Sequence, residues 1–140
     1  VDPRLSTVNK ILQILAGGRG KKCGDIMTRG VLTASSHDKV QKVSEIMMKN
    51  AVSQLPVVDG SKVVGMVSEE GITRNLSRNI ADETVEKIME PPLPSVPEET
   101  DISEIRPLLE RYPGVLVTSR GELAGIITRS DLLKVISKLI

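Results

Sequence analysis

Near its end the chain reads Glu122-Leu123-Ala124-Gly125-Ile126-Ile127-Thr128-Arg129-Ser130-Asp131, and at residues 62–71 it reads Lys62-Val63-Val64-Gly65-Met66-Val67-Ser68-Glu69-Glu70-Gly71. Each stretch predicts an apolar strand, a hydroxyl residue and then the start of a helix. The two copies differ at their last position, because Asp131 carries a carboxylate and Gly71 has no side chain. A long-period repeat of this kind predicts a chain built from two copies of one structural unit.

The composition predicts an aliphatic core. The 140 residues contain no Phe, no Trp and one Tyr, and 39% of them are hydrophobic. At this length the two copies must share one core, and neither is expected to be stable alone. The near absence of aromatic side chains leaves no platform on which single-stranded nucleic acid could stack.

The charges almost cancel, since 19 basic and 18 acidic side chains give a net charge of +1. No global field would draw the chain to DNA or to an anionic membrane.

The single cysteine, Cys23, excludes an internal disulfide and fits a reducing compartment. No apolar run is long enough to span a membrane and no signal peptide is visible, so a cytoplasmic protein is expected. The first residue, Val1, fits a fragment of a longer polypeptide or a processed terminus.

The chain divides into an arm and two repeats. Residues 1–21 form the arm, in which residues 4–15 place apolar side chains on one face of a helix before a flexible basic linker. The repeats occupy residues 22–81 and 82–140, and each is expected to run strand, helix, strand, strand, helix, which gives an α+β fold. The expected strands are at 31–33, 52–58 and 62–67 in the first repeat and at 93–96, 115–117 and 123–127 in the second. The expected helices include one of roughly ten residues that Ser68 opens and one whose apolar face runs from Ile102 to Leu109. Four prolines, at 91, 92, 94 and 97, predict an edge strand near residues 93–96.

Several short motifs resemble a known family. They are Ile26-Met27-Thr28, Ile88-Met89-Glu90, Val52-Ser53-Gln54-Leu55-Pro56-Val57-Val58-Asp59 and Gly125-Ile126-Ile127-Thr128-Arg129-Ser130-Asp131. With the repeat, they resemble a tandem pair of cystathionine beta-synthase (CBS) domains, a Bateman module. The resemblance implies two pseudo-twofold related β-α-β-β-α units packed through their sheets, with clefts that commonly bind AMP, ADP, ATP or S-adenosylmethionine. It also implies frequent association into a flat homodimer.

The turn at Thr128 is the strongest candidate site. A helix that begins there presents unpaired N–H groups and the positive end of its dipole, which favour a phosphate or a ribose hydroxyl. The resemblance assigns the ribose hydroxyls to Asp131 and a neighbouring ribose or phosphate contact to Thr128. The alternative is a capping box, because Thr-x-x-Asp before an apolar run also satisfies orphan N–H groups without any ligand. Arg129 is disfavoured in a first helical turn unless an anion offsets it, and otherwise is a solvated arginine.

For the adenine, the resemblance points to residues 89–93 and 113–116. The complete predicted ligand set is Met89, Leu93, Gly114, Val115, Leu116, Ile127, Thr128, Arg129 and Asp131. Gly114 would allow a flat base to approach the backbone closely. The alternative is that Pro113-Gly114 is only a turn between a helix and a strand.

The first repeat keeps the hydroxyl of Ser68 but lacks the carboxylate, and Glu69 and Glu70 add negative charge where a phosphate would lie. We therefore expect one good adenosine site and one weak or empty site, which only a cationic or phosphate-free adenosyl compound would suit. The residues of the weaker site are Ser53, Gln54, Leu55 and Ser68.

These patterns favour a regulatory sensor of an adenosine-containing molecule, with a fused or partner effector domain and no direct binding to nucleic acid or membrane. The alternative is a ligand-free dimerisation or interaction module. An enzyme is disfavoured because no nucleophile, base and oxyanion set occurs together, and no catalytic cofactor is expected. Cys23 and His37 fall short of the ligands that a zinc site needs, so no metal site is expected.

Overall fold

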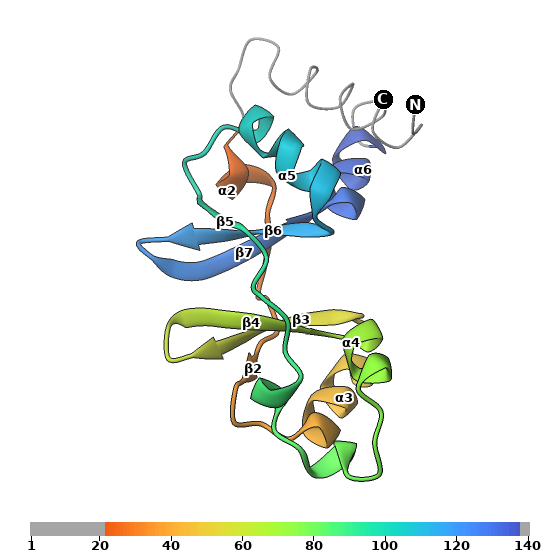
Figure 1. Cartoon of the computed structure of the whole chain (residues 1–140). Coiled ribbons are helices and arrows are strands. Elements are labelled where there is room, and N and C mark those ends of the chain that lie inside the picture. Colours follow the sequence, from red (N-terminus) through yellow and green to blue (C-terminus); the bar gives the residue numbers. More distant parts are fainter. Residues whose placement is uncertain (1–21, 138–140) are drawn as a thin grey trace. The chain divides into compact units, whose positions relative to one another are not determined.

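The computed structural model describes residues 22–137, so the helix expected at residues 4–15 lies outside the described residues. The chain separates into two compact units, each with its own sheet (Figure 1). We call residues 32–93 the central unit, and residues 22–31 together with 94–137 the split unit. The α+β class is confirmed. The start of the first repeat therefore folds with the second repeat, and the repeat boundaries at residues 81 and 82 stay a prediction.

The split unit contains a four-stranded sheet in the order β1-β7-β6-β5. Its strands are β1 (Thr28–Arg29), β5 (Ser95–Pro97), β6 (Gly114–Ser119) and β7 (Glu122–Thr128). Its helices are α2 (Cys23–Ile26), the 3-10 helix η3 (Ile102–Ile105), α5 (Arg106–Arg111) and α6 (Arg129–Ser137). The proline-rich strand β5 lies at the edge of the sheet, as predicted. The expected helix across residues 102–109 is broken, because Pro107 lacks an N–H and the α-helical pattern starts afresh at Arg106.

The central unit repeats this plan with a three-stranded sheet in the order β2-β3-β4. Its strands are β2 (Ala34–Ser35), β3 (Gln54–Asp59) and β4 (Lys62–Ser68). Its helices are α3 (Val40–Lys49), α4 (Glu69–Arg74) and the 3-10 turns η1 (Ile80–Asp82) and η2 (Val85–Lys87). In each unit the helices lie on one face of the sheet (Figure 1). Helix α4 is shorter than expected because Asn75 ends it, and the Asn75 side-chain amide donates to the Gly71 carbonyl at 2.7 Å.

Each unit has its own aliphatic core. In the split unit the fully buried residues include Ile102, Ile105, Leu109, Val115, Val117, Ile127 and Leu132. In the central unit the core consists of Ala34, Val43, Met47, Leu55, Val57, Val67 and Val85. Burying one such aliphatic side chain contributes roughly 1.5–3 kcal/mol. These cores hold the ends of β4 and β7, and therefore the two strand-to-helix turns, in fixed positions.

The two glycines that recur in the repeat allow a close backbone approach. A Cβ atom at Gly125 would lie 2.5 Å from Met27 Sδ and 2.9 Å from the Thr28 carbonyl oxygen. A Cβ atom at Gly65 would lie 2.7 Å from Met89 Sδ and 2.8 Å from the Glu90 carbonyl oxygen. The segment that carries Met27 and the one that carries Met89 thus lie against equivalent strands.

Cys23 lies in the split-unit core with no exposed surface, and burial, with help from the charges of Asp101 and Glu104, raises the pKa of its thiol from 9.0 to about 11. The raised pKa means that stability is fully present below pH 9 and falls as the pH rises towards 11. We expect wild type to lose about 2 kcal/mol more unfolding free energy than Cys23→Ala between pH 8 and pH 10.5. Urea unfolding at both pH values measures this difference, and parallel losses in the two proteins would contradict it.

Candidate functional site

Asp131 organises the turn between β7 and α6. Its carboxylate Oδ2 accepts from the Thr128 main-chain N–H at 2.8 Å and from the Thr128 hydroxyl at 3.0 Å. In return the Asp131 N–H donates to Thr128 Oγ1 at 3.3 Å. This reciprocal pair is the capping box that the sequence offered as an alternative to ligand binding. The cap is present, and it fixes the carboxylate at the helix start with 9% of the residue exposed.

A third donor to the carboxylate comes from far along the chain. The Thr28 hydroxyl donates to Asp131 Oδ1 at 2.8 Å, across a sequence separation of 103 residues. Thr28 reaches this place because β1 runs antiparallel to β7, with Thr28 opposite Ile126. In the sequence Thr28 stands out only as part of a family motif, and it is not among the predicted ligand residues. Pairing of β1 with the last strand was the missing information.

These contacts leave Asp131 with a limited capacity for further partners. A carboxylate offers about four acceptor positions, and the three donors occupy two on Oδ2 and one on Oδ1. One ribose hydroxyl could therefore bind Oδ1 directly. A second would take the position now held by the Thr28 hydroxyl, which can rotate because Thr28 is exposed. The turn can hold a vicinal diol while it keeps its cap.

Arg129 is already engaged by main-chain oxygens. Its Nε donates to the Leu109 carbonyl at 2.7 Å, and one terminal nitrogen donates to the Glu110 carbonyl at 3.2 Å. Both carbonyls belong to the last turn of α5, where a cation is favoured by the helix dipole. The sequence offered an external anion or a solvated side chain as the alternatives for Arg129. Neither describes it, because the carbonyls at the end of α5 offset its charge. Its role as a ligand residue stays a prediction.

The other predicted residues of the split unit lie in strands β6 and β7, next to the turn. Gly114 pairs with Thr128, Val115 with Ile127, and Leu116 with Ile126 across the β6–β7 ladder. The side chains of Val115, Leu116 and Ile127 are fully buried. Any contact they make with a ligand would have to involve main-chain atoms.

Met89 and Leu93 belong to the central unit. Met89 packs on that unit's core, and the neighbouring Glu90 forms an antiparallel bridge with Met66 of β4. In the split unit the equivalent place beside the last strand is taken by Met27 and Thr28. The grouping of Met89 and Leu93 with Asp131 therefore stays a prediction.

Comparison with known proteins places the chain in a family. The model of the CBS domain matches residues 23–78 and again residues 85–138. The chain belongs to the CBS domain family. Each match contains one strand-to-helix turn, from β4 to α4 in the first and from β7 to α6 in the second, so the turns at Ser68 and Thr128 lie at equivalent positions of the two CBS matches.

The chain is similar in sequence to two curated proteins and in structure to a solved CBS-pair protein. The uncharacterized protein MJ1232 of Methanocaldococcus jannaschii is 29% identical over 119 residues, which are 83% of this chain and 40% of the relative. The zinc metalloprotease MJ0392 of the same organism is 28% identical over 131 residues, 94% of this chain and 37% of the relative. The structure of CBSX2 in complex with AMP, a CBS-pair protein of Arabidopsis thaliana, is 25% identical with a TM-score of 0.71, over 86% of this chain and 98% of that chain. The chain thus spans less than half the length of these two curated relatives.

The weaker predicted site surrounds the Ser68 turn of the first CBS match. Ser68 caps α4 by accepting from the Gly71 N–H at 2.9 Å, and Gln54 pairs with Ser68 across the β3–β4 ladder. Leu55 is buried in the core, and Ser53 accepts from the Glu69 N–H through its carbonyl at 3.0 Å. These four residues therefore lie together, and their role as a ligand site stays a prediction.

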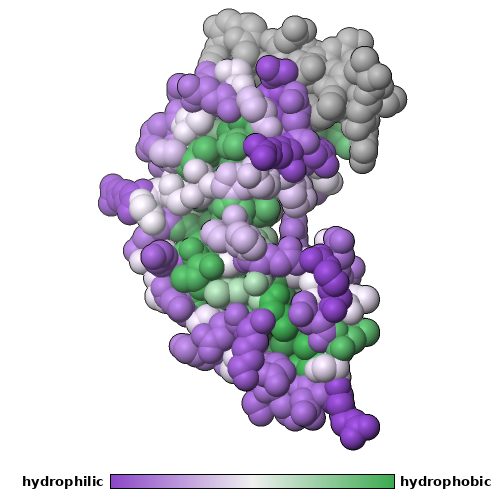
Figure 2. Space-filling model, in the orientation of Figure 1, coloured by the Kyte–Doolittle hydropathy of each residue, from purple (hydrophilic) through white to green (hydrophobic). Residues whose placement is uncertain are grey.

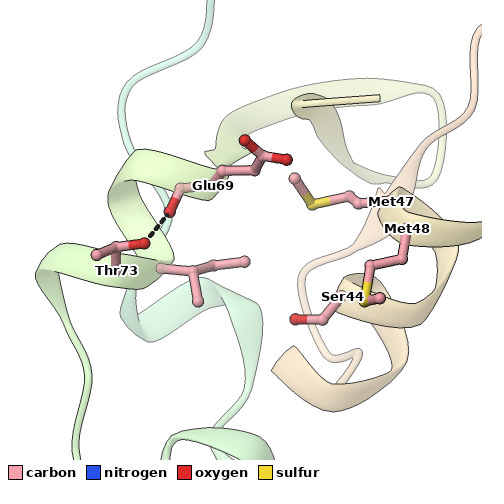
Figure 3. A pocket seen from close by; sticks show the side chains of 6 residues that line it. Ser44, Met47, Met48, Glu69 and Thr73 are labelled. Carbon is pink, nitrogen blue, oxygen red and sulfur yellow. Dashed lines mark hydrogen bonds between the residues drawn. The ribbon is translucent and has the colours of Figure 1, made fainter. Parts of the chain in front are cut away.

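A groove separates α3 from α4 in the central unit. It has a volume of about 320 Å³ and is lined by Ser44, Met47, Met48, Glu69, Ile72 and Thr73. Figure 3 shows Ser44, Met47 and Met48 facing Glu69 and Thr73 across it, with the Thr73 hydroxyl donating to the Glu69 carbonyl at 2.8 Å. Met48 is 83% exposed, and Figure 2 shows hydrophobic surface among hydrophilic residues over this part of the CBS pair.

Two kinds of feature were not found in the described residues. Between residues 22 and 137 no cluster of three or more His, Cys, Asp or Glu side chains is placed to hold a metal ion. Over the same range no helix combines the length and the apolar character required to cross a membrane.

Proposed function

We propose that this CBS pair is a regulatory module that binds an adenosine-containing molecule, namely AMP, ADP, ATP or S-adenosylmethionine, at the Thr128–Asp131 turn. The observation that carries the proposal is the carboxylate of Asp131, held by its cap and facing the Thr28 hydroxyl at 2.8 Å. A carboxylate fixed in this way is preorganised to accept hydrogen bonds from ribose hydroxyls, each worth about 1.5–3 kcal/mol when shielded from water. The AMP complex of CBSX2 supports the choice of an adenosine ligand.

The remaining predicted ligand residues complete the proposal. The main chain at Gly114, Val115 and Leu116 would face the adenine, and Arg129 and Thr128 would contact ribose or phosphate. Met89 and Leu93, which the sequence predicts as further ligand residues, belong to the central unit, whose own turn we propose to be the weaker site. Ligand binding would bias an effector that is fused to the pair or binds it, in the cytoplasm. Such a bias equals the difference in ligand affinity between two conformations.

Isothermal titration calorimetry with AMP, ATP and S-adenosylmethionine tests the proposal. At about 100 times its dissociation constant, a ligand should raise the unfolding free energy by roughly 2.7 kcal/mol, which a thermal melt would show independently. If none of the three compounds gives heat or moves the melting temperature, the sensor function fails for these ligands.

The second candidate function is a ligand-free dimerisation module, and the exposed Met48 at the α3–α4 groove favours it. If a second copy covers this groove, Met48→Glu would place a charge in an apolar contact and raise the dimer dissociation constant by at least about tenfold. Light scattering after size exclusion measures the mass at several concentrations. Leu76→Glu is the matched control, because Leu76 is 67% exposed and lies outside the groove lining. An unchanged dimer in Met48→Glu would exclude this surface.

A further inference from the structure

The two units place a carboxylate at equivalent turns by different routes. In the split unit the segment beside the last strand carries Thr28, and the helix carries Asp131. In the central unit the bridge from Glu90 to Met66 gives Glu90 the place that Thr28 has opposite Ile126. The helix position equivalent to Asp131 is Gly71. The hydroxyl of Thr28 is thus replaced by the carboxylate of Glu90, and the carboxylate of Asp131 is replaced by the hydrogen of Gly71.

The Glu90 side chain fills the space above Gly71. A Cβ atom added at Gly71 would lie 2.5 Å from Glu90 Oε1 and 3.2 Å from Ser68 Oγ. The Ser68 hydroxyl donates to the same Glu90 oxygen at 3.3 Å. The carboxylate of Glu90 therefore reaches the place where the side chain of an aspartate at position 71 would begin.

A cation lies beside this carboxylate. A terminal nitrogen of Arg74, in the last turn of α4, lies 3.6 Å from Glu90 Oε1 and also 3.6 Å from Glu70 Oε1. Glu69 and Glu70 lie in the first turn of the same helix. The turn is therefore surrounded by carboxylates, and an incoming phosphate would meet repulsion.

We propose that Glu90 is the specificity-determining residue of this CBS pair, because its carboxylate closes the Ser68 turn and restricts the chain to one nucleotide, at Asp131. The proposal rests on the proposed function for its ligand class, but its geometry stands independently. A side chain at position 71 would displace the Glu90 carboxylate from the place it holds, so residues 71 and 90 form one exchangeable pair.

A double-mutant cycle tests the pair without any ligand. Gly71→Asp should lower the melting temperature by a few degrees, because the Glu90 carboxylate must move aside and then lies close to a second carboxylate. In the Glu90→Thr background the same substitution should cost less than half as much, since threonine recreates the arrangement of Thr28. Gly71→Ala gives a milder version of the cycle if Gly71→Asp does not fold. Equal costs in both backgrounds would overturn the proposal. Glu70→Thr is the matched control, because it removes another carboxylate beside Arg74 but should not rescue Gly71→Asp.

Calorimetry with adenosine, which carries no phosphate, then measures the number of sites. We expect one adenosine per wild-type chain and two per chain of the Glu90→Thr, Gly71→Asp variant. One site in both proteins would overturn the role of Glu90 in closing the turn. If wild type binds neither adenosine nor AMP, ATP and S-adenosylmethionine, the proposed function fails, while the stability cycle still decides whether Glu90 occupies the position of the missing aspartate.

Discussion

Asp131→Ala is expected to weaken AMP binding by on the order of 100-fold or more, since two charge-assisted hydrogen bonds to ribose hydroxyls would be lost. The variant should also lose roughly 1–3 kcal/mol of stability, because Thr128 and Thr28 both donate to this carboxylate. Calorimetry with AMP and urea unfolding measure the two effects separately.

A control is needed because Asp131 caps a helix. Asp101 caps η3 of the same unit, and its Oδ1 accepts from the Ser103 N–H at 2.9 Å and from the Ser103 hydroxyl at 2.8 Å. Asp101→Ala removes a cap of the same kind away from the turn, so it should leave the AMP affinity unchanged. Equal AMP affinity in wild type and Asp131→Ala would show that Asp131 is only a cap.

Gly125→Ala is expected to destabilise the split unit by roughly 1–3 kcal/mol, because the added methyl group meets Met27 Sδ and the carbonyl oxygen of Thr28. Relief of these contacts moves β1 away from β7, so the Asp131 carboxylate loses the strand that lies beside it at Thr28. AMP affinity should therefore fall together with stability, as calorimetry and urea unfolding would show.

Gly65→Ala provides the matched control in the central unit. There the added methyl group would lie 2.7 Å from Met89 Sδ and 2.8 Å from the Glu90 carbonyl oxygen. We expect a similar loss of stability with the contact between Thr28 and Asp131 intact. If Gly65→Ala lowered AMP affinity as much as Gly125→Ala does, general destabilisation would explain both results.

Much of the fold follows from local patterns that the sequence displays. The repeated strand, hydroxyl and helix pattern predicts β4–α4 and β7–α6, and the prolines predict the edge position of β5. The pairing of Thr128 with Asp131 was also predictable, because a capping box involves residues three positions apart. Helix ends were less accurate, because Asn75 ends α4 through one side-chain hydrogen bond and Pro107 lacks the N–H that a continuous helix would use.

The contacts that complete the site could not be predicted from these patterns. Thr28 meets Asp131 only because β1 joins the sheet of the other repeat, and local periodicity contains no information on such an exchange. A signal was nevertheless present in the repeat, because Thr28 and Glu90 occupy equivalent motif positions. The second repeat has a carboxylate at this motif position and the first repeat does not, and at the equivalent positions Asp131 and Gly71 again only the second repeat's helix carries one. For Arg129, the sequence predicted that an external anion would offset its charge in the first helical turn. In the structure the carbonyls at the end of α5 offset this charge.

The most direct test of the central claim compares AMP with 2′,3′-dideoxy-AMP by calorimetry on wild type and on Asp131→Ala. If Asp131 holds the ribose hydroxyls, wild type should bind the dideoxy compound about as weakly as Asp131→Ala binds AMP, and the variant should not distinguish the two compounds. Equal binding of both compounds by wild type would contradict the claim that this carboxylate recognises a ribose.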